Sequence, residues 1–204
     1  MTRIAGRPSV NELDRPLPQR FFARPTLTVA RALLGRWLCH RVDGRVLRGR
    51  IVEVEAYTDD EASHARNRRR TPRNSVMFGA AGHAYVYFTY GMHFCFNVVT
   101  EREGTPGAVL IRGLDAIDSA NGPARLCRTL NVDLRQNGLN LTTGDILWVE
   151  SGRRSRKERV VQTTRVGIRV AETLPWRFYL SGSKGVSKRD VRAETAVAIP
   201  YPSR

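Results

Sequence analysis

Two glutamates separated by a single residue are the side chains in this sequence best suited to chemistry. In RGRIVEVEAY, residues 48–57, the alternating pattern of a strand places Glu53, Glu55 and Tyr57 on one face. Carboxylates at this spacing lie roughly 6–7 Å apart at the backbone, and such a pair can perform general acid–base catalysis when partly buried. The alternative is a solvated face on which both glutamates balance neighbouring arginines. The strand on its own favours this alternative.

An unusually aromatic stretch, AYVYFTYGMHFCFNVV, occupies residues 84–99. Gly91 permits a bend that would leave Tyr90 projecting from the end of a two-stranded structure. An exposed aromatic tip can wedge into a stack of bases, as proteins that flip nucleotides require. The alternative is ordinary sheet core, which is the better interpretation for the two phenylalanines after Gly91. For Tyr87 and Tyr90 the two interpretations are balanced.

The charge of the chain indicates its class of partner. It contains 34 Lys and Arg residues against 19 Asp and Glu residues, a formal net charge of +15, and nearly all of the cations are arginines. This excess favours a polyanion, and the guanidinium fork suits phosphate oxygens in particular. An arginine-rich genome and an acidic protein partner are the alternatives.

Arginines concentrate in two runs, at residues 64–74 and 153–159. Runs of this kind usually lie in solvated loops. The first run separates the glutamate strand from the aromatic stretch, where it could grip phosphates with a strong salt dependence. It is therefore the more informative of the two.

Several classes of site and location are disfavoured by the pattern. The three cysteines, Cys39, Cys95 and Cys127, are scattered and flanked by apolar residues, which predicts reduced core thiols and no disulfide framework. The sequence has no CxxC or HExxH motif, and we expect neither a metal nor a cofactor. No signal core or run of roughly 20 apolar residues is present, so we expect a cytoplasmic protein without membrane contact, associated with the nucleoid if the source is a bacterium.

A sheet with a few helices must position these residues. Asp43-Gly44 lies between two apolar segments and predicts a hairpin of strands at residues 37–42 and 45–57. Further strands are expected at residues 84–99 with a break at Gly91, 108–114, 146–150, 165–170 and 176–181. Because strands and helices are mixed without βαβ regularity, we predict an α+β single domain with a curved, mainly antiparallel β-sheet and surrounding helices.

The helices and the ends of the domain follow from capping signals and composition. A helix is expected at residues 26–34, capped by Thr26 or Thr28 and ended by Gly35, and another at residues 121–130 with Pro123 near its start. We expect a flexible N-terminal segment over residues 1–20, one domain over 21–190 and a C-terminal tail over 191–204.

The motifs occur together in a familiar order. IVEVEAY is followed by EASHA, TPRNSVMF, AYVYFTYGMHFCFN, GAVLIRGL, GPARLCRTL, RVGI and WRFYLSGS, which cover roughly residues 21–188. In this order they closely resemble the alkyladenine (3-methyladenine) DNA glycosylase family. The resemblance implies a monofunctional DNA repair enzyme that flips an alkylated or deaminated purine out of duplex DNA and hydrolyses its N-glycosyl bond. No lysine in these motifs resembles a Schiff-base nucleophile.

The resemblance also implies catalytic roles for three residues. Glu55 occupies the position of the general base that activates water for attack at C1′. Arg112 of AVLIRGL matches a residue that helps to hold this water. Val166 of RVGI corresponds to a position whose backbone carbonyl also contacts it.

The remaining roles implied by the resemblance concern the damaged base and the duplex. Tyr57 resembles one wall of the base pocket, His64 and Tyr87 the opposite wall, and Asn97 the residue that crowds the exocyclic amino group of normal guanine. Tyr90 resembles the side chain that fills the vacated place in the duplex. We expect Met92 and His93 to lie beside Tyr90 at the intercalating tip. We expect Arg66 and Arg73 to contact the DNA backbone. At His93 family members can carry a tyrosine, so the DNA contacts there can differ.

The expected partner is double-stranded DNA that contains a damaged purine, bound by a monomer. Two other functions fit parts of the pattern. A noncatalytic basic nucleic-acid-binding protein would use the arginines and tyrosines and leave Glu55 structural. A hydrolase of free nucleosides or small glycosides would use Glu53 and Glu55, but the charge of +15 argues against it.

Overall fold

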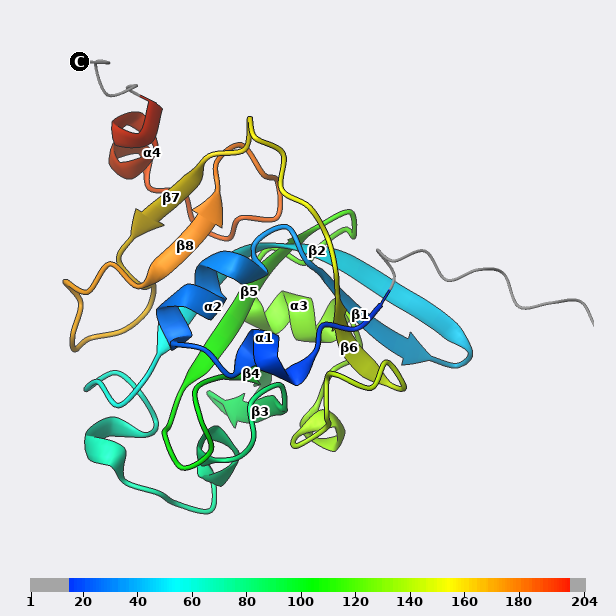
Figure 1. Cartoon of the computed structure of the whole chain (residues 1–204). Coiled ribbons are helices and arrows are strands. Elements are labelled where there is room, and N and C mark those ends of the chain that lie inside the picture. The colour runs from blue at the N-terminus through cyan, green and yellow to red at the C-terminus, as the bar shows by residue number, and fades with distance from the viewer. Residues whose placement is uncertain (1–14, 199–204) are drawn as a thin grey trace, which may run out of the picture.

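An eight-stranded, curled antiparallel sheet forms the body of the computed structural model, which describes residues 15–198 (Figure 1). The strand order is β3-β4-β5-β2-β1-β6, while β8 pairs with β2 and β7 pairs with β8. The strands are β1 Trp37–Val42, β2 Arg45–Tyr57, β3 Ala84–Thr89, β4 His93–Val99, β5 Ala108–Asp115, β6 Leu147–Glu150, β7 Val160–Thr163 and β8 Arg177–Leu180.

Short helices pack on the sheet and connect its strands. They are α1 Gln19–Phe22, α2 Thr26–Leu33, α3 Pro123–Thr129 and α4 Val191–Ala198, with 3₁₀ turns η2 Arg66–Arg68, η3 Ser75–Phe78 and η4 Leu134–Gln136. Helix α2 packs against β2 and β5, and α3 packs against β4 and β5. In Figure 1 α2 lies nearer the viewer and α3 lies farther away. The α+β fold class predicted from the sequence is confirmed.

Strand β2 is the centre of the sheet, and this explains the burial of its carboxylates. Its first half pairs with β1, while its second half is flanked by β5 on one side and β8 on the other. The register shifts at Glu53, which pairs with Gly113 of β5, so that Arg112 falls in an irregular part of the ladder. Both Glu53 and Glu55 are 0% exposed. The solvated strand face that the alternation alone favoured is therefore wrong.

The core lies between the sheet and its helices and is built mainly from aliphatic and phenylalanine side chains. Phe22 of α1, Phe96 of β4 and Phe178 of β8 are fully buried in one continuous cluster. Burial of a side chain of this size contributes about 1.5–3 kcal/mol to the free energy of folding. A smaller cluster around Met77 and Tyr85 includes Ala65 of the first arginine run. Cys39, Cys95 and Cys127 are buried free thiols, as predicted.

Both expected hairpins are present. Asp43 and Gly44 have φ values of 48° and 74°, which a two-residue hairpin turn requires. The aromatic stretch divides into β3 and β4 around Gly91, whose φ is 68°. The strand expected at residues 165–170 is absent, and β7 lies just before it. The reason is that Gly167 has a φ of 77°, while Arg165 turns inward to bind Asp60 and the carbonyl of Ala56.

The helix near the N-terminus is confirmed, but its cap differs from the expected one. Helix α2 begins at Thr26, and its N-cap position is Pro25, which offers no side-chain acceptor. The carboxylate of Glu101 replaces that acceptor, because it accepts hydrogen bonds from both the backbone N–H and the hydroxyl of Thr26. The helix at residues 121–130 is confirmed as α3, with Pro123 as its first residue.

Both ends of the described chain contact the sheet. Leu17, which lies in the segment expected to be flexible, is buried, and its N–H donates to the carbonyl of Val149. Helix α4 occupies much of the expected C-terminal tail and contacts β7. The rest of both expected ends, residues 1–14 and 199–204, lies outside the described residues. None of the helices in residues 15–198 is long and apolar enough to cross a membrane.

Candidate active site

Glu55 is held in one orientation by three donors from three parts of the chain. Its Oε1 accepts from the backbone N–H of Val166 at 2.7 Å. Its Oε2 accepts from the hydroxyl of Tyr57 at 2.9 Å and from a guanidinium nitrogen of Arg112 at 3.2 Å. Burial and then the carboxylate of Glu55 raise the pKa of Tyr57, so its hydroxyl stays protonated and keeps donating at neutral pH.

Arg112 connects the two glutamates. Its Nε donates to Glu53 at 3.2 Å, while Nη1 donates to Glu55 at the same distance. Burial lowers the pKa of Arg112, but the carboxylates of Glu55 and Glu53 outweigh burial and hold this pKa above its ordinary value. Arg112 is therefore a fixed cation beneath the pocket, and its charge offsets that of the buried glutamates.

A pocket of about 360 Å³ lies directly beside these charges. It brings together Tyr57, Arg112 and Val166, which surround Glu55, with His64, Tyr87 and Asn97. Six side chains that the sequence assigned to one site therefore meet at a single cavity, although they come from β2, β3, β4, β5 and two loops. The remaining walls include Met77, Cys95 and Leu110, which add apolar surface beside the polar side chains.

Aromatic rings form one wall of this pocket. His64 lies 4.5 Å from Tyr87 between ring centroids, and its Nδ1 is 2.8 Å from the hydroxyl of Tyr85. Partial burial, and then the positive charge of Arg73, lower the pKa of His64. Burial raises the pKa of Tyr85 to about 12, and it also raises the pKa of Tyr87. At neutral pH the wall thus consists of uncharged rings.

Asn97 lies in β4 at the inner side of the pocket. Its side-chain amide is buried and donates to the carbonyl of Tyr85 at 3.0 Å. This hydrogen bond crosses from β4 to β3 and fixes the side chain against the pocket wall. In residues 15–198 no three His, Cys, Asp or Glu side chains are arranged to hold a metal ion.

Comparison with known proteins decides the family. The model of the methylpurine-DNA glycosylase family matches residues 20–184. The chain belongs to this family. The resemblance seen in the sequence is thereby confirmed, and so is the enzyme class, a DNA glycosylase that hydrolyses N-glycosyl bonds. As in the sequence analysis, Glu55 and the pocket residues fall within the matched range.

Individual relatives agree with the family match. A protein of Carboxydothermus hydrogenoformans is 47% identical over 190 residues, covering 85% of this chain and 99% of its own. Relatives from Clostridium acetobutylicum, 40% identical, and Bacillus cereus, 42% identical, each cover 84% of this chain and 97% and 98% of their own. All three carry the name "Putative 3-methyladenine DNA glycosylase".

In this glycosylase the β3–β4 hairpin carries the residues expected to enter the duplex. Tyr90 stands at its tip with 81% of its surface exposed, and it also reaches the rim of the 360 Å³ pocket. Met92 is 69% exposed. Met92 and His93 line a separate hollow of about 230 Å³ between the hairpin and α3.

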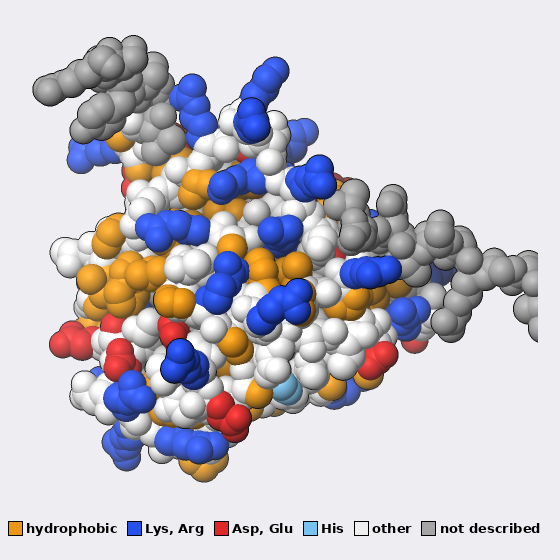
Figure 2. All heavy atoms as spheres, in the orientation of Figure 1, with side chains coloured by type: hydrophobic (Ala, Val, Ile, Leu, Met, Phe, Trp, Pro, Cys, Tyr) orange, Lys and Arg blue, Asp and Glu red, His pale blue; other side chains and the backbone are white. Residues whose placement is uncertain are grey.

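The two arginines expected on the DNA backbone lie on the loop that borders the pocket. Arg66 is exposed in η2. Arg73 is also exposed and donates to the carbonyl of Phe88 at 2.9 Å, with its guanidinium 5.6 Å from the centre of the Tyr87 ring. Arg73 thus ties this loop to the hairpin. Lys and Arg side chains are also spread over the face in Figure 2, so the basic surface is not confined to this loop.

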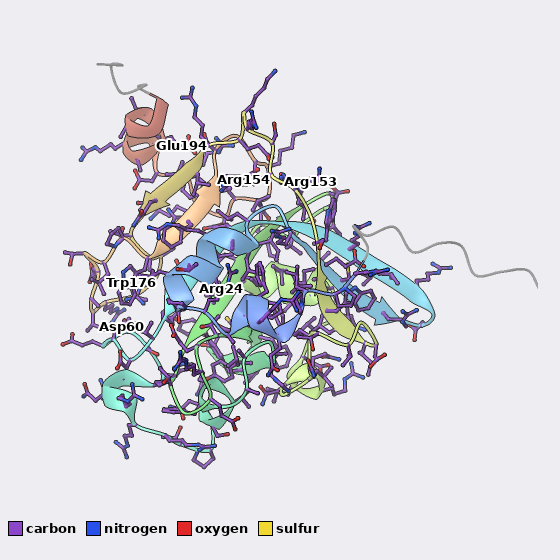
Figure 3. All side chains as sticks on the ribbon, viewed as in Figure 1. Arg24, Asp60, Arg153, Arg154, Trp176 and Glu194 are labelled. Carbon is purple, nitrogen blue, oxygen red and sulfur yellow. The ribbon has the colours of Figure 1, made fainter. Side chains whose placement is uncertain are left out.

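Arg165, which the sequence motifs did not single out, contacts the pocket residue Tyr57. Arg165 is buried, binds both carboxylate oxygens of Asp60 and lies 4.7 Å from the centre of the Tyr57 ring and 5.2 Å from that of Trp176. Figure 3 shows Asp60 and Trp176 near each other at one side of the molecule. The motif RVGI contains Arg165, but only the fold shows that its partners lie in the segment after β2.

Two further residues near the glutamates were also missed. Arg177 donates to Glu53 at 2.8 Å. Ser187 contacts Glu53 with both its backbone N–H, at 2.5 Å, and its hydroxyl, at 3.0 Å. The motif WRFYLSGS includes Arg177, whereas Ser187 has no distinguishing signal in the sequence.

Proposed function

We propose that this glycosylase excises alkylated or deaminated purines, of the 3-methyladenine, 7-methylguanine, hypoxanthine and ethenoadenine class, after flipping them out of duplex DNA. The observation that carries this proposal is the fully buried Glu55 carboxylate at an aromatic-walled pocket of about 360 Å³. A charged group is rarely buried without a partner. Here its partners, Arg112 and Val166, also line the pocket.

In the proposed reaction Glu55 acts as general base. It accepts a proton from a water molecule as the water oxygen bonds to C1′ of the sugar. The bond from C1′ to the base nitrogen breaks at the same time, and its electron pair leaves with the base through an oxocarbenium-like transition state. Arg112 and the backbone carbonyl of Val166 position the water.

The fate of the leaving base depends on its charge. An alkylated purine is cationic and departs neutral once it has taken the electron pair. Hypoxanthine and ethenoadenine are neutral and must gain a proton as they depart, and no side chain of the pocket is assigned this role. Stacking between Tyr57 on one side and His64 and Tyr87 on the other favours electron-poor cationic rings. Asn97 would exclude guanine by crowding its exocyclic amino group.

The duplex is proposed to bind across the hairpin and the neighbouring loop. Tyr90 would fill the space left by the flipped nucleotide, with Met92 and His93 against the adjoining base pairs. Arg66 and Arg73 would contact phosphates. We also propose that the protein acts as a monomer, because one chain supplies all of the pocket residues. We place it in the cytoplasm, because its substrate is cellular DNA and its relatives are bacterial proteins.

The test uses duplex oligonucleotides that each contain one lesion, incubated with the protein in EDTA and then treated with alkali to cut abasic sites. We expect strand cuts at the lesion and none in undamaged duplex. Tight binding without cleavage of any lesion would indicate a noncatalytic DNA-binding protein. Equal rates on free nucleosides and on duplex DNA would indicate a small-substrate hydrolase.

A further inference from the structure

Glu53 has no part in the reaction proposed above, yet it accepts more hydrogen bonds than the proposed base, Glu55. It is 0% exposed. Four hydrogen bonds reach it, two from the side chains of Arg112 and Arg177 and two from Ser187. A buried carboxylate costs several kcal/mol of desolvation unless such partners offset it. A purely structural position in a sheet centre is normally filled by an apolar residue.

The first consequence of this arrangement is the orientation of Arg112. A guanidinium is planar, so fixing one edge fixes the direction of the others. Glu53 accepts from Nε of Arg112, and Ser187 accepts from Nη2 at 3.3 Å. The remaining terminal nitrogen, Nη1, is thereby directed at Glu55 and the pocket.

The second consequence concerns the loop that carries Val166. Arg177 donates from Nη1 to Glu53 and from Nε to the carbonyl of Thr164 at 3.0 Å. Thr164 lies two residues before Val166, whose N–H holds the other oxygen of Glu55. Glu53 is therefore linked to both oxygens of Glu55. Arg112 links it to Oε2, and Arg177 links it to the loop whose Val166 N–H binds Oε1.

We propose that Glu53 is a positioning residue for hydrolysis, which holds Arg112 toward the pocket and keeps the charges around Glu55 balanced. This inference rests on the proposed role of Glu55 as base. The set contains two carboxylates and two guanidiniums, so its net charge is zero. Removal of the Glu53 charge would leave Glu55 alone with two cations and would free Arg112 to turn.

Other titratable groups border this set and remain unchanged in the experiment. Tyr57 on β2 and Cys95 on β4 lie close to Glu55 and Arg112. Tyr179 on β8 lies beside Arg177, with its ring centre 5.1 Å from the guanidinium. Arg165, from the loop after β7, contacts Tyr57. All of these are present in both proteins of each comparison below.

The experiment measures single-turnover excision and, separately, lesion-duplex affinity for the wild type and for Glu53→Gln. Glutamine keeps the shape of the side chain and removes its charge. We expect the excision rate to fall by on the order of ten- to hundredfold, with little change in affinity, because Arg112 is misplaced while the DNA-binding surface is intact.

A matched control separates positioning from structure. Glu150→Gln removes another buried carboxylate, one that binds the indole N–H of Trp148 and Arg48 in the outer part of the sheet. We expect this variant to keep the wild-type excision rate and affinity. A Glu53→Gln protein with a wild-type rate, or one whose rate and affinity fall together, would overturn the proposal.

Two additional variants separate a failure of the proposal for Glu53 from a failure of the proposed role of Glu55. If Glu53→Gln does not fold, Ser187→Ala removes the hydroxyl that contacts both Glu53 and Arg112 and retains every charge. A lower rate with unchanged affinity would support the proposal, and a wild-type rate would overturn it. Glu55→Gln tests the proposed function by itself. Excision by that variant at the wild-type rate would refute Glu55 as base, whatever Glu53→Gln does.

Discussion

At the scale of single residues, the site depends on charges that water does not reach. Glu55 is buried, and its hydrogen bonds to Val166, Tyr57 and Arg112 take the place of solvent. Breaking a buried ion pair by removal of one partner typically costs 3–5 kcal/mol, since the other charge is left uncompensated. The same electrostatics governs His64 at the rim of the pocket, where burial and Arg73 disfavour a positive charge.

His64 leads to a prediction on stability. Its pKa in the folded protein lies below the ordinary value of 6.5, so the unfolded chain binds this proton more readily. The contribution to stability is present above pH 6.5 and is lost as pH falls below it. We expect the melting temperature of the wild type to drop more between pH 7 and pH 5 than that of His64→Gln. Equal drops in the two proteins would contradict the shifted pKa.

At the scale of secondary-structure elements, the tip of the β3–β4 hairpin has a strained backbone. Tyr90 has a φ of 53°, a conformation that a bulky side chain rarely adopts. Such a residue costs on the order of 1–3 kcal/mol, and strain of this kind concentrates at functional sites. The cross-strand pairing of β3 with β4 holds the turn in place. The hairpin thus holds the backbone of Tyr90 at the tip, with its side chain exposed.

We predict that Tyr90→Ala slows excision by about tenfold or more, because unstacking a base pair costs a few kcal/mol and nothing then fills the gap. The loss should be smaller when the lesion lies opposite a mismatch, where less stacking is broken. Single-turnover rates on both duplexes measure this. Ile146→Ala, which shortens another exposed apolar residue, should excise at the wild-type rate. Equal losses on matched and mismatched duplexes would argue against the wedge.

Helix α2 leads to a prediction on folding. Glu101 serves as its N-terminal acceptor in place of a capping side chain, through the bonds to Thr26. Loss of such a cap costs about 1 kcal/mol, so Glu101→Ala should lower the melting temperature by roughly 2–4 °C. Glu103→Ala, at an exposed position two residues later, should leave it unchanged. Identical melting temperatures for Glu101→Ala and the wild type would show that the contact contributes nothing.

At the scale of the whole molecule, the excess positive charge lies on more than one surface, and only part of it lies near the pocket. The first arginine run borders the pocket, while Arg153 and Arg154 of the second run lie on a loop at the opposite side of the view from η2 (Figures 1 and 3). A basic protein can bind DNA with any part of its surface, so only a salt titration separates the two runs.

We predict that Arg66→Ala reduces the slope of log affinity against log salt concentration by about one, as expected for the loss of one phosphate contact. Arg156→Ala, in the second run, should leave the slope unchanged. Fluorescence anisotropy of a labelled lesion duplex between low and high salt measures both. A reduced slope for Arg156→Ala and an unchanged one for Arg66→Ala would place the DNA on the other side of the molecule.

How much could be read from the sequence also depended on scale. Local signals were sufficient for the Asp43-Gly44 hairpin, the break at Gly91 and helix α3, because turn and cap residues act over a few positions. The partners of Glu53 could not be predicted in this way. Arg177 and Ser187 lie more than a hundred positions away in sequence, and only the pairing of β8 with β2 brings Arg177 to it.

The wrong predictions have physical reasons as well. The segment at residues 165–170 has the composition of a strand, but the inward turn of Arg165 and the positive φ of Gly167 prevent it. The alternation in β2 predicted one solvated face, whereas packing on both faces buries residues 51–56. Alternation of polar and apolar residues identifies amphipathic strands. It cannot identify charged residues that are buried because they pair with one another.

The most direct test of the central claim compares excision and binding by Glu55→Gln. Duplex DNA that contains a single hypoxanthine or a methylated purine is incubated with excess protein in EDTA, and release of the free base is followed in a single turnover. We predict that the variant binds the lesion duplex as the wild type does and that its excision rate falls by on the order of 10²–10⁴. A folded Glu55→Gln protein that releases the base at the wild-type rate would contradict the account.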